Sequence, residues 1–197
     1  MTVNRQSKRS KRGRKVAKTS RKPISAHVER RLWAESAGKC MNPDCRADLF
    51  ISNGDIAERA HIVPYCESAE NTFDNLILIC PNCHTNFDKN SAFTADEVRE
   101  WKSIRHAEID RVFGKTFSSF DDLRKEAAPL LARNKSIYEN YYMKDKRRLW
   151  DVFEKEIIVN NRKLCTMFES NLCLFQNHKD NSFSNQAAVR DFIDHAK

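Results

Sequence analysis

Two close pairs of cysteines constrain this chain more than any other feature of its sequence. The first pair reads Cys40-Met-Asn-Pro-Asp-Cys45 and the second reads Cys80-Pro-Asn-Cys83. Proline and asparagine favour turns, so each pair can present two thiolates to the same ion. Because four thiolates satisfy tetrahedral zinc, the spacing predicts a structural zinc site that joins residues 40–45 to residues 80–83. The alternative interpretation is a set of buried free thiols.

The remaining cysteines and the chain's hydropathy indicate the compartment. The chain has seven cysteines, and its polar, basic N-terminus lacks the apolar stretch of a secretory signal. In a reducing compartment, paired cysteines indicate metal rather than disulfides. We therefore expect a cytoplasmic protein, or a nuclear one if its source has a nucleus, with Cys165 and Cys173 in its core. The sequence contains no run of about eighteen apolar residues, so we expect no membrane span.

Positive charge is concentrated at the N-terminus. The formal net charge is +8, yet residues 1–22 carry ten lysines and arginines and no acid, which leaves −2 for the rest. Such a block repels itself and binds polyanions by releasing their counterions. We therefore predict nucleic acid as the partner and a disordered tail over residues 1–23. The residues expected to contact nucleic acid are Arg9, Lys11, Arg12, Arg14 and Lys15. The alternatives are a solubilising tail or an address signal.

The rest of the chain divides into two stretches of different character. Residues 24–113 hold clustered Cys, His, Asn and Asp, with a helix expected from Val28 to Gly38. Strands over 49–51 and 60–63 are predicted to form a hairpin around the Asn-Gly turn. An apolar run over 76–79 precedes a helix expected from about His84, and Thr94 with Glu97 fits a capping box. The expected fold class is α+β, a zinc-stapled ββα core with flanking helices.

Residues 114–197 predict a mostly helical C-terminal region. Apolar residues recur there at helical spacing, and Pro129 is expected to break or kink one helix. This stripe is expected to pack against the rest of the protein. The alternative is that the stripe binds a partner, which would be a regulatory protein or a second copy of the chain.

The residues between the cysteine pairs carry a resemblance to a known family. They read Glu58-Arg-Ala-His61-Ile-Val-Pro64, then Asn75-Leu-Ile-Leu-Ile-Cys80-Pro-Asn-Cys83-His84, and then Asp88-Lys89. Over about residues 26–110 the chain resembles the HNH, or His-metal finger, nucleases in their four-cysteine branch. The stretch from Leu32-Trp-Ala-Glu to Trp101-Lys102 is similar to the HNH heads of bacterial anti-phage effectors. The resemblance implies hydrolysis of DNA phosphodiester bonds and an effector role in anti-phage defence.

The signature residues of that resemblance suit the chemistry. His61 is expected to be the general base, because a histidine can accept a proton at neutral pH. His84 and Asp88 lie four residues apart, so on a helix they share one face and can hold a catalytic Mg²⁺ or Mn²⁺. The resemblance implies that Asn75 holds the loop that carries His61 or orients its ring.

One position departs from the family pattern, and each residue has a plainer interpretation. Many HNH enzymes carry Asp or His directly before the base, where this chain has Ala60. Glu58 is a weak candidate for the missing metal ligand, because strand alternation places it on the face opposite His61. Taken singly, His61 can be structural, His84 a zinc ligand and Asp88 a surface charge. The alternative function is a non-catalytic zinc-containing module that binds DNA or recruits a partner.

Overall fold

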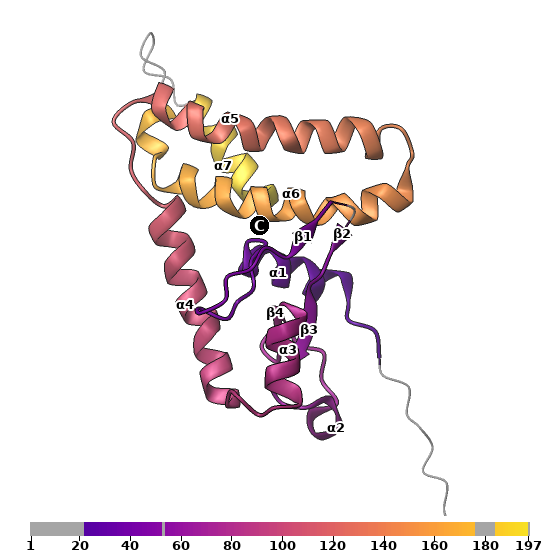
Figure 1. Cartoon of the computed structure of the whole chain (residues 1–197). Coiled ribbons are helices and arrows are strands. Elements are labelled where there is room, and N and C mark those ends of the chain that lie inside the picture. Colours follow the sequence, from indigo (N-terminus) through magenta and orange to yellow (C-terminus); the bar gives the residue numbers. More distant parts are fainter. Residues whose placement is uncertain (1–21, 53, 176–183, 197) are drawn as a thin grey trace, which may run out of the picture.

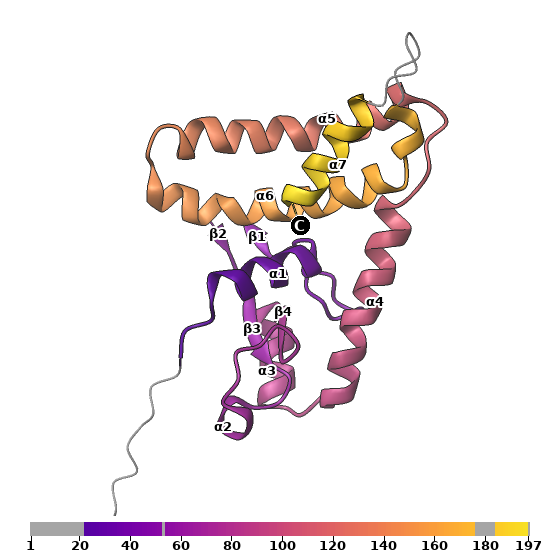
Figure 2. The same cartoon turned by 180° about the vertical axis from the view of Figure 1, so that it is seen from behind.

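The computed structural model describes residues 22–52, 54–175 and 184–196. They form two parts, which Figures 1 and 2 show one above the other. The lower part holds the strands and the helices up to α3, with α4 running along its side. The upper part is a layer of long helices, and α6 of this layer lies across α1. The expected nucleic-acid contacts from Arg9 to Lys15 lie outside the described residues.

The strands of the lower part form two separate antiparallel pairs. Strand β1 (Phe50–Ile51) pairs with β2 (Gly54–Asp55). Strand β3 (Glu58–His61) pairs with β4 (Leu76–Ile79), with Glu58 opposite Ile79 and His61 opposite Leu76. The predicted hairpin between 49–51 and 60–63 is therefore wrong. Every residue of β4 is buried, so this apolar run has to lie inside the protein, and β3 supplies its hydrogen-bonding partner there.

Helix α1 (Ala26–Ser36) begins at an N-cap and ends in a left-handed residue. The side chain of Ser25 accepts a hydrogen bond from the Val28 backbone amide, as expected of a serine N-cap. Ala37 takes the left-handed conformation at the C-cap, with φ of 46°. The predicted stop at Gly38 is thus one residue late, although Gly38 itself has φ of 77°, a value that favours glycine.

Helices α3 and α4 follow the second strand pair. Helix α3 (Pro81–Asp88) begins earlier than the predicted His84, because Cys80 is its N-cap and proline is well suited to the first helical position. After the short helix α2 (Tyr65–Ser68), strand β4 and helix α3, helix α4 (Ala95–Phe113) begins at a capping box. The predicted reciprocal bonds between Thr94 and Glu97 are present.

The core of the lower part gathers around α1 and β4. Lys102 of α4 crosses to both elements: its ammonium group donates to the Leu76 carbonyl over 2.8 Å and pairs with the Glu35 carboxylate over 2.9 Å. Burial raises the pKa of Glu35, although Lys102 opposes this shift. The fully buried large side chains around this point include Leu32, Trp33, Met41, Leu49, Ile62, Leu76, Ile77, Leu78 and Ile79.

The upper part contains α5 (Phe120–Ile137), the π-helix η1 (Tyr138–Tyr142), α6 (Arg147–Glu169), the 3-10 helix η2 (Leu172–Phe175) and α7 (Ser184–Ala196). Its buried cluster is distinct from that of the lower part, and Val159 of α6 packs into the lower one. Helix α5 continues through Pro129 rather than breaking there. Cys165 is buried as expected, but the expectation for Cys173 is wrong, since it is exposed.

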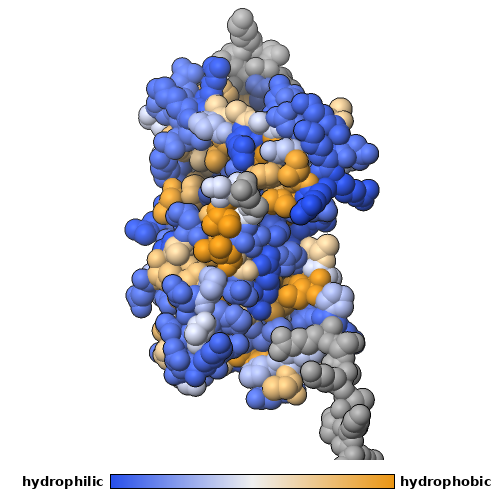
Figure 3. Space-filling view, turned by 45° about the vertical axis from the view of Figure 1, so that its right-hand side comes forward, coloured by the Kyte–Doolittle hydropathy of each residue, from blue (hydrophilic) through white to orange (hydrophobic). Residues whose placement is uncertain are grey.

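Charged side chains join the two parts of the protein. Arg30 of α1 pairs with Glu154 of α6 over 2.8 Å, and Asp55 of β2 pairs with Lys155 of α6 over 2.7 Å. The surface view in Figure 3 is mostly hydrophilic, with separate apolar patches. No helix within the described ranges is long and apolar enough to cross a membrane.

Candidate functional site

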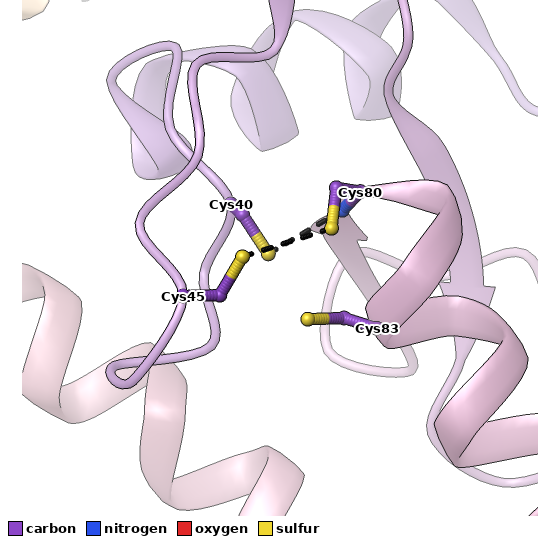
Figure 4. A group of neighbouring side chains, drawn as sticks. All are labelled: Cys40, Cys45, Cys80 and Cys83. Carbon is purple, nitrogen blue, oxygen red and sulfur yellow. Dashed lines mark hydrogen bonds between the residues drawn. The ribbon is translucent and has the colours of Figure 1, made fainter.

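The first cysteine pair lies on a loop that the backbone shapes closely. The Cys40 amide donates to the Ala47 carbonyl over 2.8 Å, and the Cys45 amide donates to the Asn42 carbonyl over 3.1 Å. Arg46 adopts a left-handed conformation, with φ of 48°, and its guanidinium donates to the carbonyl of Met41 over 2.9 Å. These bonds fold the loop back on itself, so both thiols point toward the N-terminus of α3 (Figure 4).

All four thiols converge on one point between this loop and α3. Their sulfur atoms lie within 4.8 Å of one another, and the Cys45 and Cys80 sulfurs are 3.7 Å apart. Tetrahedral zinc, with Zn–S bonds of about 2.3 Å, requires separations of about 3.8 Å. The cluster therefore fits zinc. Cys40, Cys45, Cys80 and Cys83 would be the ligands, and His84 is not among them.

Two nitrogen atoms donate hydrogen bonds to these sulfurs and would stabilise their thiolate forms. The Cys80 amide donates to the Cys40 sulfur over 3.3 Å, and the Asn42 side chain donates to the Cys83 sulfur over 3.4 Å. Burial raises the pKa of Cys40 to about 11 and also raises the pKa of Cys83. Burial opposes ionisation of Cys80 too, but hydrogen bonds, first from the Cys83 backbone, lower its pKa. An ion bound here has to displace protons from the buried thiols.

Carboxylates lie on both sides of the His84 ring. Its Nε2 atom is 3.1 Å from Oδ2 of Asp88, one turn later on α3, and its Nδ1 atom is 3.8 Å from Oε2 of Glu58 on β3. Two neighbouring ligands of an octahedral ion with bonds of about 2.1 Å are about 3 Å apart. His84 and Asp88 therefore fit one divalent ion. Glu58 faces the opposite nitrogen, so in this arrangement it cannot bind that same ion together with Nε2.

His61 lies at the end of β3 in a separate set of contacts. Its Nε2 atom is 2.8 Å from Oδ1 of Asn71, and its ring meets the edge of Tyr65 with centroids 5.4 Å apart. Within the described residues, it makes no hydrogen bond or ion pair with His84 or Asp88. The structure thus brings Glu58, His84 and Asp88 together, with His61 further along β3.

Asn75 binds the loop that follows His61 rather than its ring. Its Oδ1 accepts from the Val63 amide over 2.8 Å, and its Nδ2 donates to the Val63 carbonyl over 3.0 Å and to the Ser68 hydroxyl over 3.1 Å. Asn71, which does contact His61, belongs to no motif that would mark it in the sequence. Its amide side chain in the polar loop ten residues after His61 is the one signal that the sequence offers.

The first cysteine pair, strands β3 and β4 and the histidine-bearing helix α3 all lie within one short segment of the chain. Residues 40–89 match the family model of the HNH endonucleases. The matched segment runs from Cys40 to the residue after Asp88, and the helices from α4 onward lie outside it. It indicates nuclease activity and metal binding in general terms. Neither the curated proteins nor the solved structures gave a match to this chain.

Proposed function

We propose that this protein is a metal-dependent endonuclease that hydrolyses DNA phosphodiester bonds. The observation that carries the proposal is the HNH match over a strand-strand-helix unit in which a histidine ends the first strand and a histidine–carboxylate pair lies on the helix. Four cysteines at the base of that helix fit the structural zinc that would hold the unit together.

The proposed chemistry divides among three groups of side chains. His61 would accept the proton of the attacking water. His84 and Asp88 would hold Mg²⁺ or Mn²⁺, which supplies charge neutralisation at the phosphate and at the departing oxygen when bound. Glu58, whose carboxylate lies 3.8 Å from Nδ1 of His84, would favour a proton on Nδ1 by its charge and so present Nε2 as a ligand, the usual role of a carboxylate behind a metal-binding histidine. Asn75 would keep the loop after His61 in place.

The wider role extends this proposal beyond the site. DNA is proposed as the substrate because nucleases of this kind act on a polyanion and residues 1–22 carry ten positive charges. An effector role in anti-phage defence rests on the sequence resemblance alone, and a cytoplasmic location stays an expectation from the paired cysteines. A domain boundary near residue 113 and a regulatory protein or second copy bound by the C-terminal helices likewise stay predictions.

A non-catalytic zinc module that binds DNA or recruits a partner is the alternative. That function needs the four cysteines and the basic N-terminus, but it needs neither a histidine at the end of β3 nor a histidine with carboxylates at both ring nitrogens. The placement of Glu58 and Asp88 around His84 therefore favours the enzyme.

Cleavage of supercoiled plasmid DNA tests the two alternatives. The full chain should convert the plasmid to nicked or linear forms with Mg²⁺ or Mn²⁺ and lose this activity with EDTA. His61→Ala should lower the rate by about 10²–10⁴-fold, the usual contribution of a general base. His27→Ala is the matched control, since His27 is an exposed histidine on α1. Near-normal cleavage by His61→Ala, with zinc content unchanged, would contradict the proposal.

A further inference from the structure

Asn71 makes a hydrogen bond at each end of its side-chain amide, one of them to the His61 ring. Its Nδ2 donates to the Lys22 carbonyl over 2.6 Å, and its Oδ1 is 2.8 Å from Nε2 of His61. An amide nitrogen only donates and an amide oxygen only accepts. Because Nδ2 is engaged by a carbonyl, Oδ1 faces the histidine, and Nε2 must carry the proton that it accepts. The lone pair of neutral His61 then lies on Nδ1.

Lys22 contacts both residues that flank this ring, and it does so through its backbone. Its amide donates to the Tyr65 hydroxyl over 3.2 Å, while its carbonyl accepts from Asn71. Tyr65 in turn lies with its ring at the edge of the His61 ring. The last residue of the basic N-terminal block is therefore anchored beside the histidine at the end of β3.

We propose that Asn71 is a positioning residue, which fixes the Nε2-protonated form of His61 and ties its ring to the backbone of Lys22. This inference rests on the proposed role of His61 as the base. A ring held in this way keeps Nδ1 unprotonated and in a constant direction, which a base needs in order to accept a proton from water.

Substitutions of Asn71 in the full-length chain separate positioning from folding. Asn71→Ala should lower kcat for plasmid cleavage by about tenfold, the equivalent of one missing hydrogen bond, with little change in KM. Asn71→Asp places a carboxylate beside Nε2, which favours the charged ring. The acid limb of the pH profile of kcat/KM should then move up by about one pH unit. A merely structural residue would not move that limb.

The matched controls are the same two substitutions at another asparagine, Asn140. Asn140 lies in η1, where its side chain bonds with Ser136 and Lys144, so Asn140→Ala and Asn140→Asp should leave kcat and the pH profile unchanged.

Proton NMR of the His61 ring supplies a readout that does not depend on activity. In Asn71→Asp the titration midpoint of the His61 ring resonance should rise by about one pH unit, and in Asn140→Asp it should stay in place. Wild-type kcat in both Asn71 variants, or an unmoved resonance, would overturn the inference. If His61→Ala cleaves normally while the resonance moves, the contact stands and the proposed role of His61 fails.

Discussion

Asn75→Ala should destabilise the protein, because the Asn75 side chain replaces strand pairing where β3 ends. Asn75 is 9% exposed and satisfies both the amide and the carbonyl of Val63. Without these bonds two backbone groups have no partner, at about 1–3 kcal/mol each when buried. Val63 is only partly buried, so water recovers some of that cost. We expect a decrease of about 2–3 kcal/mol in the free energy of unfolding, or about 4–12 °C in Tm.

Asn75→Asp sharpens this prediction through its pH dependence. The carboxylate keeps an acceptor for the Val63 amide but sets a second oxygen against the Val63 carbonyl. The introduced carboxyl can donate only when protonated, so folding raises its pKa. Its contribution to stability is present below its unfolded pKa of about 3.9 and is lost as pH rises through the higher folded value. Asn75→Asp should therefore gain stability relative to Asn75→Ala as pH falls from about 7 to about 5.

Urea unfolding followed by the fluorescence of the buried Trp33 and Trp101 measures both effects. Asn90→Ala is the control, since that exposed side chain bonds Asn86 within one turn, and it should change stability by less than about 0.5 kcal/mol. An Asn75→Ala variant as stable as Asn90→Ala would refute the reasoning. So would a stability difference between Asn75→Asp and Asn75→Ala that stays constant with pH.

Four further predictions concern metal and DNA. Elemental analysis should find one zinc per chain. Cys80→Ser should unfold the part of the chain around the four cysteines, because structural zinc contributes about 10–16 kcal/mol of apparent binding free energy. Folded, zinc-free protein would contradict this. Acid should release that zinc to a chromogenic chelator, since burial raises the pKa of Cys40 to about 11 and protons compete for the thiolates. Asp88→Ala should need more Mg²⁺ or Mn²⁺ for cleavage than wild type, and superimposed metal titrations would make Asp88 a surface charge. Deleting residues 1–22 should make the affinity for duplex DNA less dependent on salt. The slope of log affinity against log salt should become shallower by about 0.9 for each phosphate that the segment neutralises. An unchanged slope would mean that this segment does not bind the DNA backbone.

The sequence predicted those features that depend on residues close together in the chain. Cys40 with Cys45 and Cys80 with Cys83 are close neighbours in the chain, so their spacing predicted the cluster that the structure contains. The capping box at Thr94 was predictable for the same reason, because its hydrogen bonds join residues within one helical turn. The likeness to HNH endonucleases also came from this compact run of residues.

Only the tertiary structure decided which distant segments meet. β3 pairs with β4 rather than with the strand before the Asn-Gly turn, because the fully buried run Leu76–Ile79 needs a partner inside the core. The same packing places Glu58 beside the second nitrogen of His84 and brings Lys22 to Asn71, across 49 positions of the chain. Strand periodicity sets the face on which a side chain lies, but it does not set which element covers that face. That choice depends on how the whole chain buries its apolar surface.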